Sequence, residues 1–257
     1  MTSSSDPQKR RSRLKPTTLQ KPLRESRWVI EVLRWVYELR WATNDQLQLT
    51  MGLHRGTMQS HLRKLLDAEM LKPQPVIRNQ VGMGGSPKLI YKLTGKGKDV
   101  LARHLGTSDF SSVPVGNLSP YFAPHIMAIN DVRALVYRAS LQSGWSLGTW
   151  LDERTIRADY DTVTITIPTA KLNKTYTVQV PIVPDAHFTL NMGNKGEAFF
   201  MLEVDRGTES TKTFQKKVFG YLEYIRSGGF EHRFHHGAFR VITIVDTATP
   251  ARLKTLL

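Results

Sequence analysis

The chain has 257 residues, of which 40% are hydrophobic, and a formal net charge of +14 at pH 7. This length allows one large domain or two ordinary ones with a substantial apolar core. The absence of cysteine excludes disulfides and thiolate metal sites, and no apolar run approaches the ~20 residues of a membrane-spanning helix. We therefore expect a protein of the reducing cytoplasm that does not enter a membrane.

The positive charge is concentrated in the first 105 residues. Residues 1–27 carry eight Lys and Arg against two acids, and residues 28–105 carry twelve against six, whereas residues 106–257 carry sixteen against fourteen. A strongly basic half indicates a polyanionic partner, most simply nucleic acid. Residues 1–27 have few apolar side chains and a KRRSRLK cluster, which predicts a disordered basic arm that either contacts phosphates or only adds solubility.

The predicted elements that follow are three helices, two strands and a further helix. Apolar residues at helical spacing predict helices over 28–40, 45–50 and 54–70, the second capped by Thr43 or Asn44. Strands are predicted over 71–78 and 88–93 around a glycine-rich tip, and a helix over 94–104. This order is typical of a winged helix-turn-helix domain, which we place at 28–105.

The third predicted helix and the wing supply the candidate DNA contacts. If Met58, Leu62 and Leu65 pack inward, the opposite face of the helix is polar and exposed. Such side chains reach base edges and phosphates in the major groove. The candidates on the helix and beside the wing tip are Arg55, Thr57, Gln59, Ser60, Arg63, Lys64, Arg78, Asn79, Gln80 and Lys88. A winged helix that contacts other proteins is the alternative, and the basic charge argues against it.

The second half of the chain predicts a mixed α/β domain. A stretch rich in Ser, Pro and Gly over 106–121 predicts a linker before a domain at 122–257. The predicted elements are a helix over 124–143, an extended segment over 145–156, strands over 162–168 and 176–180, a hairpin over 182–204, a helix over 210–226, a loop over 231–237, a strand over 239–245 and a helix from Thr249. The predicted fold class of the whole chain is therefore α+β.

The hairpin carries three acids that predict a chemical site. A turn centred near residue 194 sets Asp185 opposite Glu203. Asp205 falls on the same face as Glu203, because side chains two apart on a strand point the same way. Like charges this close need a compensating Lys, Arg or divalent metal, such as Mg²⁺ or Mn²⁺. In the alternative interpretation, Glu203 and Asp205 are exposed acids paired with neighbours such as Arg206.

Several segments together resemble a known family. VPDAHFTL, FFMLEVDRGT and the following helix with its paired lysines resemble the core of the PD-(D/E)-x-K nucleases, in which an Asp and a Glu on a hairpin hold catalytic magnesium. With PHIMAINDVRALV and the winged helix, the chain resembles the bacterial replication-relaxation family of plasmids and other mobile elements. The resemblance implies a nuclease-like second domain and a role in replication or its control.

The resemblance also assigns roles to particular residues. Asp185 and Glu203 match the metal-binding and catalytic acids, and Glu153 is the candidate for a further acid from an upstream element. Asp205 stands where the nucleases have the lysine that orients the attacking water, so the motif is incomplete. Lys217 lies at the edge of the apolar stripe of its helix, from which it can lean toward the hairpin and replace that lysine. An ordinary boundary lysine is the alternative.

The helix that carries Lys217 has its apolar residues on one stripe. These residues are Phe214, Val218, Tyr221, Leu222 and Ile225. Among them, Tyr221 is predicted to be a core residue rather than a catalytic one.

Three functions are compatible with these patterns. The preferred one is a protein that binds double-stranded DNA through the winged helix and acts in replication or its control. The second is a magnesium-dependent DNA endonuclease or nickase. The third is a winged-helix transcriptional repressor whose second domain forms a homodimer or contacts another replication or mobilisation protein. A palindromic DNA footprint favours the third, because a two-fold dimer reads two half-sites.

Overall fold

The computed structural model describes residues 22–75, 89–106, 110, 113–114, 116–168, 175–207 and 209–245. The elements are mixed α and β, which confirms the α+β class. The chain divides into two compact units, Met1–Leu135 and Val136–Leu257, here named the N-terminal unit and the C-terminal unit. The division falls inside helix α5 (Ala123–Gln142). The linker predicted over 106–121 is described only in part and stays a prediction.

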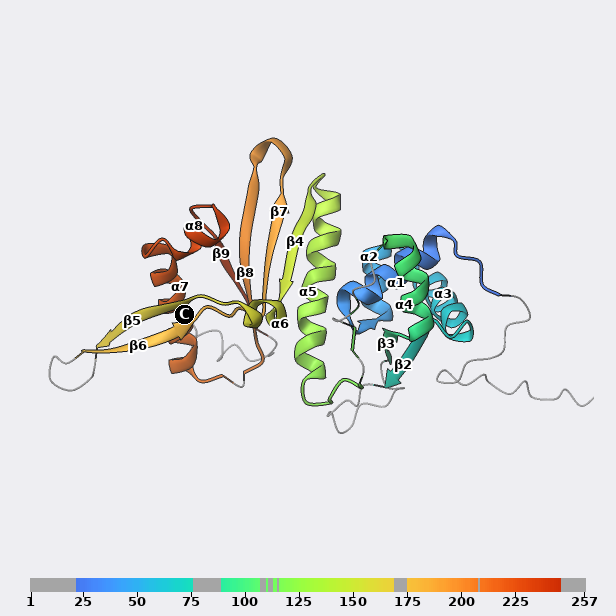
Figure 1. The fold of residues 1–257 in the computed structure, drawn as a ribbon, viewed down its shortest axis with the longest axis horizontal. Coiled ribbons are helices and arrows are strands. Elements are labelled where there is room, and N and C mark those ends of the chain that lie inside the picture. The colour runs from blue at the N-terminus through green and yellow to red at the C-terminus, as the bar shows by residue number, and fades with distance from the viewer. Residues whose placement is uncertain are drawn as a thin grey trace, which may run out of the picture. The chain divides into compact units, whose positions relative to one another are not determined.

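The N-terminal unit combines helices with a small sheet (Figure 1). Before α5 its elements are α1 (Arg27–Leu39), β1 (Ala42–Thr43), α2 (Asn44–Met51), α3 (Arg55–Asp67), β2 (Leu71–Pro75), β3 (Leu89–Leu93) and α4 (Gly95–Leu105). The sheet order is β1-β3-β2, with antiparallel pairing throughout. The order of helices and strands is the predicted one, with β1 added where a short break was expected.

The apolar stripes of α1 and α3 are buried, as predicted. In α1 the buried stripe includes Val29, Val32, Leu33, Val36 and Leu39, and in α3 it is Met58, Leu62, Leu65 and Leu66. Burying an aliphatic side chain of this size contributes about 1.5–3 kcal/mol relative to exposure. These stripes therefore determine which face of α3 is left in solvent.

A capping box explains why a short break suffices between α1 and α2. Thr43 Oγ1 accepts a hydrogen bond from Gln46 N at 3.1 Å, and Gln46 Oε1 accepts one from Thr43 N at 2.9 Å. The two bonds satisfy backbone donors that the start of a helix otherwise leaves without partners. Gly52, with a φ of 64°, ends α2 in the left-handed conformation. Of the two predicted caps, Thr43 is the one that forms.

The first half of α5 is bonded to the N-terminal unit. Asn130 Nδ2 donates to the carbonyl oxygens of Leu39 at 3.0 Å and Trp41 at 2.8 Å. Gln46 Nε2 donates to Asp131 Oδ1 at 2.7 Å. The helix that was predicted to open the second domain thus begins inside the first compact unit.

The C-terminal unit contains a four-stranded sheet and a separate two-stranded sheet. Its elements after α5 are β4 (Ser146–Asp152), α6 (Glu153–Ala158), β5 (Thr162–Pro168), β6 (Thr175–Pro181), β7 (Ala186–Asn191), the 3-10 turn η1 (Gly193–Lys195), β8 (Glu197–Asp205), α7 (Thr211–Arg226), α8 (Gly229–Phe234) and β9 (Arg240–Val245). The larger sheet has the order β4-β7-β8-β9, and only β9, beside β8, is parallel to its neighbour. Strands β5 and β6 pair only with each other among the described residues.

The β7–β8 hairpin has the predicted register. Ala186 pairs with Leu202 and Asn191 with Glu197, so the pairing is symmetric about the turn at η1. Asp185 lies just before β7, and its backbone N donates to Leu202 O at 2.9 Å. Asp185 is therefore placed opposite Glu203 at the open end of the hairpin.

Two short helices were not predicted. Helix α6 occupies the end of the segment predicted as extended, and Asp152 caps it by accepting a hydrogen bond from Thr155 N at 2.9 Å. Helix α8 includes residues that were predicted to be in a loop, and its Phe230 is fully buried. Each of the two helices has six residues, which is too short for a clear helical periodicity.

Helix α7 packs closely on the smaller sheet. Its buried residues are Gly220, Tyr221 and Tyr224, and the tyrosines join a core with Val180 of β6 and Phe230 of α8. A Cβ atom on Gly220 would lie 2.9 Å from Val180 Cγ1, which is too close for a normal contact. The glycine thus permits the close approach of α7 to β6.

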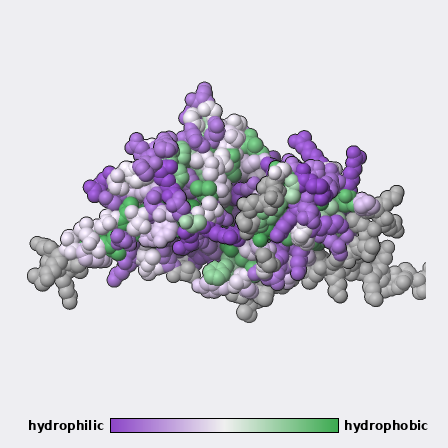
Figure 2. All heavy atoms as spheres, in the orientation of Figure 1, coloured by the Kyte–Doolittle hydropathy of each residue, from purple (hydrophilic) through white to green (hydrophobic). Residues whose placement is uncertain are grey.

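The described surface is rich in polar side chains. Strongly hydrophilic residues project from the visible face of the N-terminal unit (Figure 2). Among the helices in the described ranges, none has both the length and the apolar character needed to span a membrane.

Candidate functional site

The exposed face of α3 is polar and basic. Arg55, Thr57, Gln59, Ser60 and Lys64 are all exposed, as predicted. The helix begins at Arg55, directly after its N-cap His54, whose Nδ1 accepts a hydrogen bond from Gly56 N at 3.3 Å. A helix N-terminus carries partial positive charge, to which the Arg55 guanidinium adds. This end of α3 therefore has the electrostatic character of an anion-binding surface.

The remaining candidates for DNA contact differ from this group. The side chain of Arg63 is only 24% exposed, and its Nη2 lies 2.8 Å from Asp67 Oδ1 in an ion pair within α3. The prediction that Arg63 is largely exposed is therefore wrong, while its role in DNA contact stays a prediction. The wing candidates Arg78, Asn79, Gln80 and Lys88 lie outside the described residues.

A ring stack lies beside the polar face. The rings of Trp28 and His61 are stacked, with centroids 4.0 Å apart, and Lys64 Nζ lies 6.0 Å from the Trp28 ring. Burial lowers the pKa of His61, and the charge of Lys64 lowers it further. His61 is thus neutral at pH 7, and the stack ties the start of α1 to α3 while restricting the position of Lys64.

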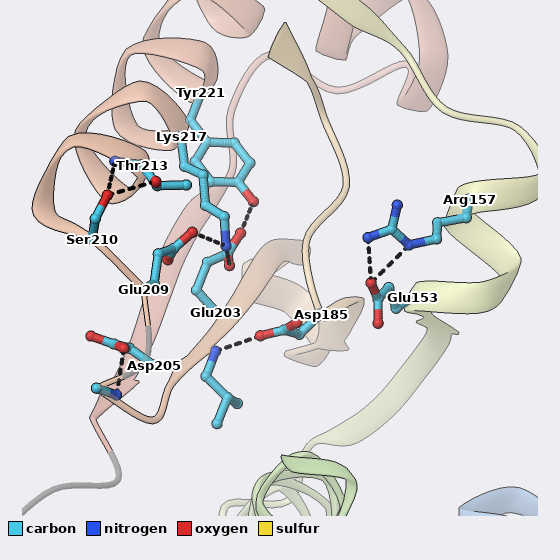
Figure 3. Close-up of polar contacts among 12 residues, drawn as sticks. Glu153, Arg157, Asp185, Glu203, Asp205, Glu209, Ser210, Thr213, Lys217 and Tyr221 are labelled. Carbon is cyan, nitrogen blue, oxygen red and sulfur yellow. Dashed lines mark hydrogen bonds and ion pairs between the residues drawn. The ribbon is translucent and has the colours of Figure 1, made fainter. Parts of the chain in front are cut away.

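In the C-terminal unit, the carboxylate of Glu203 is held by two side chains of α7 (Figure 3). Lys217 Nζ lies 2.9 Å from Glu203 Oε2 and 3.2 Å from Glu209 Oε1. The hydroxyl of Tyr221 donates to Glu203 Oε1. Lys217 thus leans toward the hairpin, as its place on the helix predicted. Glu203 is only 4% exposed, so its interpretation as an exposed acid is wrong.

The protonation states of this cluster follow from burial and from the neighbouring charges. Burial raises the pKa of Glu203, the ammonium of Lys217 opposes this effect, and Asp185 adds to it. Burial alone would lower the pKa of Lys217, but Glu203 and Glu209 together raise it above its ordinary value. Burial and Glu203 raise the pKa of Tyr221, so its hydroxyl keeps its proton. Lys217 therefore acts as a permanent cation.

Asp185 contacts the backbone of β8 and lies close to a second acid, Glu153. Its Oδ2 accepts a hydrogen bond from Val204 N at 2.6 Å. A carboxylate oxygen of Glu153 in α6 lies within 4.8 Å of one of Asp185. Glu153 also accepts a hydrogen bond from Arg157 Nε at 2.8 Å, as Figure 3 shows. The structure therefore brings Asp185 close to Glu153, which the family resemblance made the candidate for a further acid from an upstream element.

Asp205 has a structural role at the end of the hairpin. It is 4% exposed, and its Oδ1 accepts a hydrogen bond from Gly207 N at 2.8 Å. Gly207 has a φ of 74°, which favours glycine, so the carboxylate stabilises the turn that leaves β8. Its interpretation as an exposed acid is wrong, and a catalytic role for Asp205 stays a prediction.

Sequence reasoning missed one member of the cluster and did not foresee a hydrogen bond made by another. Glu209 was not singled out, although it directly precedes Ser210, the N-cap of α7, and Lys217 follows about two helical turns later. Tyr221 is a core residue, as predicted, and it also donates to Glu203. Its place one turn after Lys217 on the same side of the helix was the available signal.

These observations define an α+β protein with a basic helix face in one unit and a buried acid–lysine–tyrosine cluster in the other. The model of the replication-relaxation family matches residues 33–242, which is most of the chain. The chain belongs to the replication-relaxation family, and this membership suggests a role in replication. No curated protein and no solved structure matches the chain.

Proposed function

We propose that this protein binds duplex DNA through α3, the recognition helix of a winged helix-turn-helix domain, and acts in replication or its control on a plasmid or other mobile element. The observation that carries the proposal is the exposed face of α3. Arg55 can donate two hydrogen bonds to a guanine edge, Gln59 can pair with adenine, and Lys64 can hold a phosphate. Family membership supports the role in replication.

The charge distribution supports the same proposal. Residues 1–105 contain twenty Lys and Arg against eight acids, whereas the rest of the chain is nearly balanced. Contacts with phosphates provide most of the affinity of a protein for DNA, and contacts with base edges provide the specificity. The two classes of side chain occur together on α3.

Single substitutions on α3 test the proposal. We would select preferred duplexes from a random pool and measure affinities by fluorescence anisotropy for the wild type, Arg55→Ala and Lys64→Ala. Arg55→Ala should weaken binding about 10–100-fold and relax the preference at one base pair, because a bidentate contact is lost. Lys64→Ala should weaken binding to all sequences about equally.

Lys195→Ala is the matched control for these variants. Lys195 is an exposed lysine in the η1 turn of the C-terminal unit, so its loss should leave the affinity within about twofold of the wild type if α3 is the binding surface. Equal losses in all three variants would indicate a general charge effect and would contradict the role of α3.

A metal-dependent nuclease activity is a second candidate, because the carboxylates of Asp185 and Glu153 lie within 4.8 Å of each other. Two hard oxygen donors fit Mg²⁺ or Mn²⁺. We propose that these two acids hold such an ion, which when bound would polarise a phosphate and activate water. The predicted ligand Glu203 is instead held by Lys217 and Tyr221. Lys217, as a permanent cation, can stabilise negative charge but cannot take a proton from water.

Calorimetry and a plasmid nicking assay test this second candidate together. We would titrate Mg²⁺ and Mn²⁺ into the wild type, Asp185→Asn and Glu153→Gln, with Glu231→Gln, an exposed acid of α8, as the control. Metal binding and nicking should disappear in the first two variants and persist in the control. If the wild type binds metal but does not nick the plasmid, the ion has a structural role only. If it neither binds metal nor nicks the plasmid, the nuclease activity is excluded.

A further inference from the structure

The smaller sheet of the C-terminal unit has one buried and one exposed face. Strands β5 and β6 pair antiparallel, with Thr164 opposite Gln179 and Thr166 opposite Thr177. Residues that lie opposite each other in a sheet, like residues two apart on one strand, point to the same face. These four residues are exposed. The alternate residues form the buried face, which shares a core with α7 and includes Val163, Ile165 and Val180.

The exposed face of this sheet is polar but uncharged. Among the described residues, those exposed on this face are five threonines, one glutamine and one proline. Asp, Glu, Lys and Arg make up 23% of the chain and are the residue types most often found exposed, but none of them lies on this face. We name its central residues, Thr164, Thr166, Thr177 and Gln179, the ribbon face. The ribbon face thus presents hydrogen-bonding groups without charge.

The two strands form a narrow ribbon that extends away from the four-stranded sheet (Figure 1). Paired strands lie about 4.8 Å apart, whereas the major groove of B-DNA is about 12 Å wide and admits a two-stranded ribbon. From Thr162 to Thr166 the strand rises about 13 Å, which corresponds to about four base pairs. The ribbon therefore has the width and the length of an element that can enter the major groove.

We propose that the ribbon face reads base edges in the major groove of duplex DNA, as a second recognition element in addition to α3. This inference rests on the duplex binding proposed above. The amide of Gln179 forms a pair of hydrogen bonds with adenine, because its Nε2 donates to N7 and its Oε1 accepts from the N6 amino group. Each threonine hydroxyl donates to a base edge or accepts from one, and each threonine methyl group can contact the methyl group of thymine.

The charge and the composition of the ribbon favour DNA over a protein partner. Residues 162–181 contain two lysines and no acid, in a chain that has 22 acids. A carboxylate on the ribbon face would be repelled by the phosphates beside the groove, whereas a net charge of +2 favours the approach of a polyanion. The core of a protein interface is normally rich in aromatic and other apolar side chains. The ribbon face consists of threonine and glutamine only.

The affinity of full-chain variants for a duplex selected by the wild type from a random pool tests the inference. Gln179→Ala should weaken binding about 10-fold or more in fluorescence anisotropy and should remove the preference for adenine at one base pair, because a bidentate contact is lost. Thr164→Val keeps the shape and the strand propensity of the residue, and the loss of its hydroxyl should weaken binding about 2–10-fold. Thr164→Ser keeps the hydroxyl and should retain most of the affinity.

Gln215→Ala is the matched control, because Gln215 is an exposed glutamine of α7, outside the ribbon. It should bind DNA like the wild type, and circular dichroism should show all variants folded, since the replaced side chains are exposed.

Arg55→Ala, measured alongside, separates this inference from the role of α3. If Arg55→Ala binds weakly while Gln179→Ala and Thr164→Val bind like the wild type, the ribbon does not read DNA and the role of α3 stands. The inference is also overturned if Gln179→Ala and Arg55→Ala lose their preference at the same base pair, or if Gln215→Ala loses as much affinity as Gln179→Ala. A wild type that binds no duplex overturns both proposals.

Discussion

Lys64 of α3 and Lys217 of α7 are both helical lysines, but their surroundings differ. Lys64 is exposed and lies over the Trp28 ring, whereas Lys217 is partly buried between Glu203 and Glu209. An exposed charge costs the fold little and is available to a ligand, while a buried charge must be matched by the fold itself. The polar groups of α3 should therefore determine binding, and those around α7 should determine stability.

Acidification is expected to cause the largest loss of stability, through a buried histidine of the C-terminal unit. His187 is 2% exposed, and burial lowers its pKa to about 4, while Phe200 O, 3.1 Å from its Nδ1, opposes this shift. Because the pKa is depressed in the folded state, the stability is fully present above pH 6.5 and falls as the pH drops toward 4. The loss should reach about 3 kcal/mol.

Urea unfolding between pH 7 and pH 4 measures this loss. His187→Gln should be less stable at pH 7 but should lose less of its stability with falling pH, because the group that takes up the proton is absent. A wild type and a variant with parallel pH profiles would show that His187 does not cause the acid sensitivity.

Replacing Lys217 should produce the next largest effect. Lys217→Met leaves the carboxylate of Glu203 buried without its cation and should reduce the free energy of unfolding by about 2 kcal/mol at pH 8, a value that allows for the partial exposure of Lys217. The ammonium opposes the rise in the pKa of Glu203, so in the variant this pKa rises further. The destabilisation should therefore shrink as the pH falls and Glu203 takes up a proton.

Two lysine variants sharpen the comparison. Lys216→Met changes the exposed neighbour of Lys217 in α7, and Lys64→Met changes the exposed lysine of α3. Each should alter the free energy of unfolding by less than about 0.5 kcal/mol. Only Lys64→Met should weaken DNA binding. A loss of stability in Lys64→Met as large as in Lys217→Met would remove the distinction between the two regions.

Replacing two helical glycines with alanine should have smaller effects on stability, and the two effects should differ in sign. Gly220→Ala should destabilise the C-terminal unit by about 1–2 kcal/mol, because the new Cβ meets Val180 Cγ1 at 2.9 Å and the better helix propensity of Ala offsets only part of this clash. Gly95→Ala, at the start of α4, meets no atom within 4 Å and should be neutral or stabilising by up to about 1 kcal/mol. Thermal unfolding of both variants measures the difference.

A modest effect on stability is also expected at the cap of α2. Thr43→Ala removes the hydroxyl that accepts from Gln46 N, which should reduce stability by about 1 kcal/mol. Thr43→Ser keeps the hydroxyl acceptor and should therefore retain most of the wild-type stability. DNA affinity at a temperature where both variants are folded should be unchanged, since Thr43 is 8% exposed and lies outside the polar face of α3. A selective loss of DNA affinity in Thr43→Ala would contradict this separation.

Local sequence patterns predicted the hairpin and the direction in which Lys217 leans. The register of β7 and β8 followed from a glycine-containing turn between two apolar runs, and the glycines at 193 and 196 have positive φ values of 66° and 84°. The lean of Lys217 followed from helical geometry, which places it beside Tyr221. These features depend on neighbours that are close in sequence.

The features that sequence did not predict depend on contacts between distant elements. Periodicity shows that Val218, Leu222 and Ile225 share one side of α7, but it cannot show that the fold buries the adjacent side instead. The pairing of Asp185 with Glu153 requires the six-residue α6, which has too little periodicity to predict. The burial of Glu203 likewise depends on the packing of α7 against the hairpin.

The central claim, that the basic N-terminal unit binds duplex DNA, is tested most directly by the salt dependence of DNA affinity. We would measure the dissociation constant for one selected duplex by fluorescence anisotropy at four salt concentrations, for the wild type and for the double variant of Arg55→Ala and Lys64→Ala. The account predicts a linear fall of log affinity with log salt, with weaker binding and a slope that is smaller by about 1 in the double variant, because without the phosphate contact of Lys64 about one fewer counterion is released on binding. Affinity that does not depend on salt, or equal slopes and equal affinities for both proteins, would contradict it.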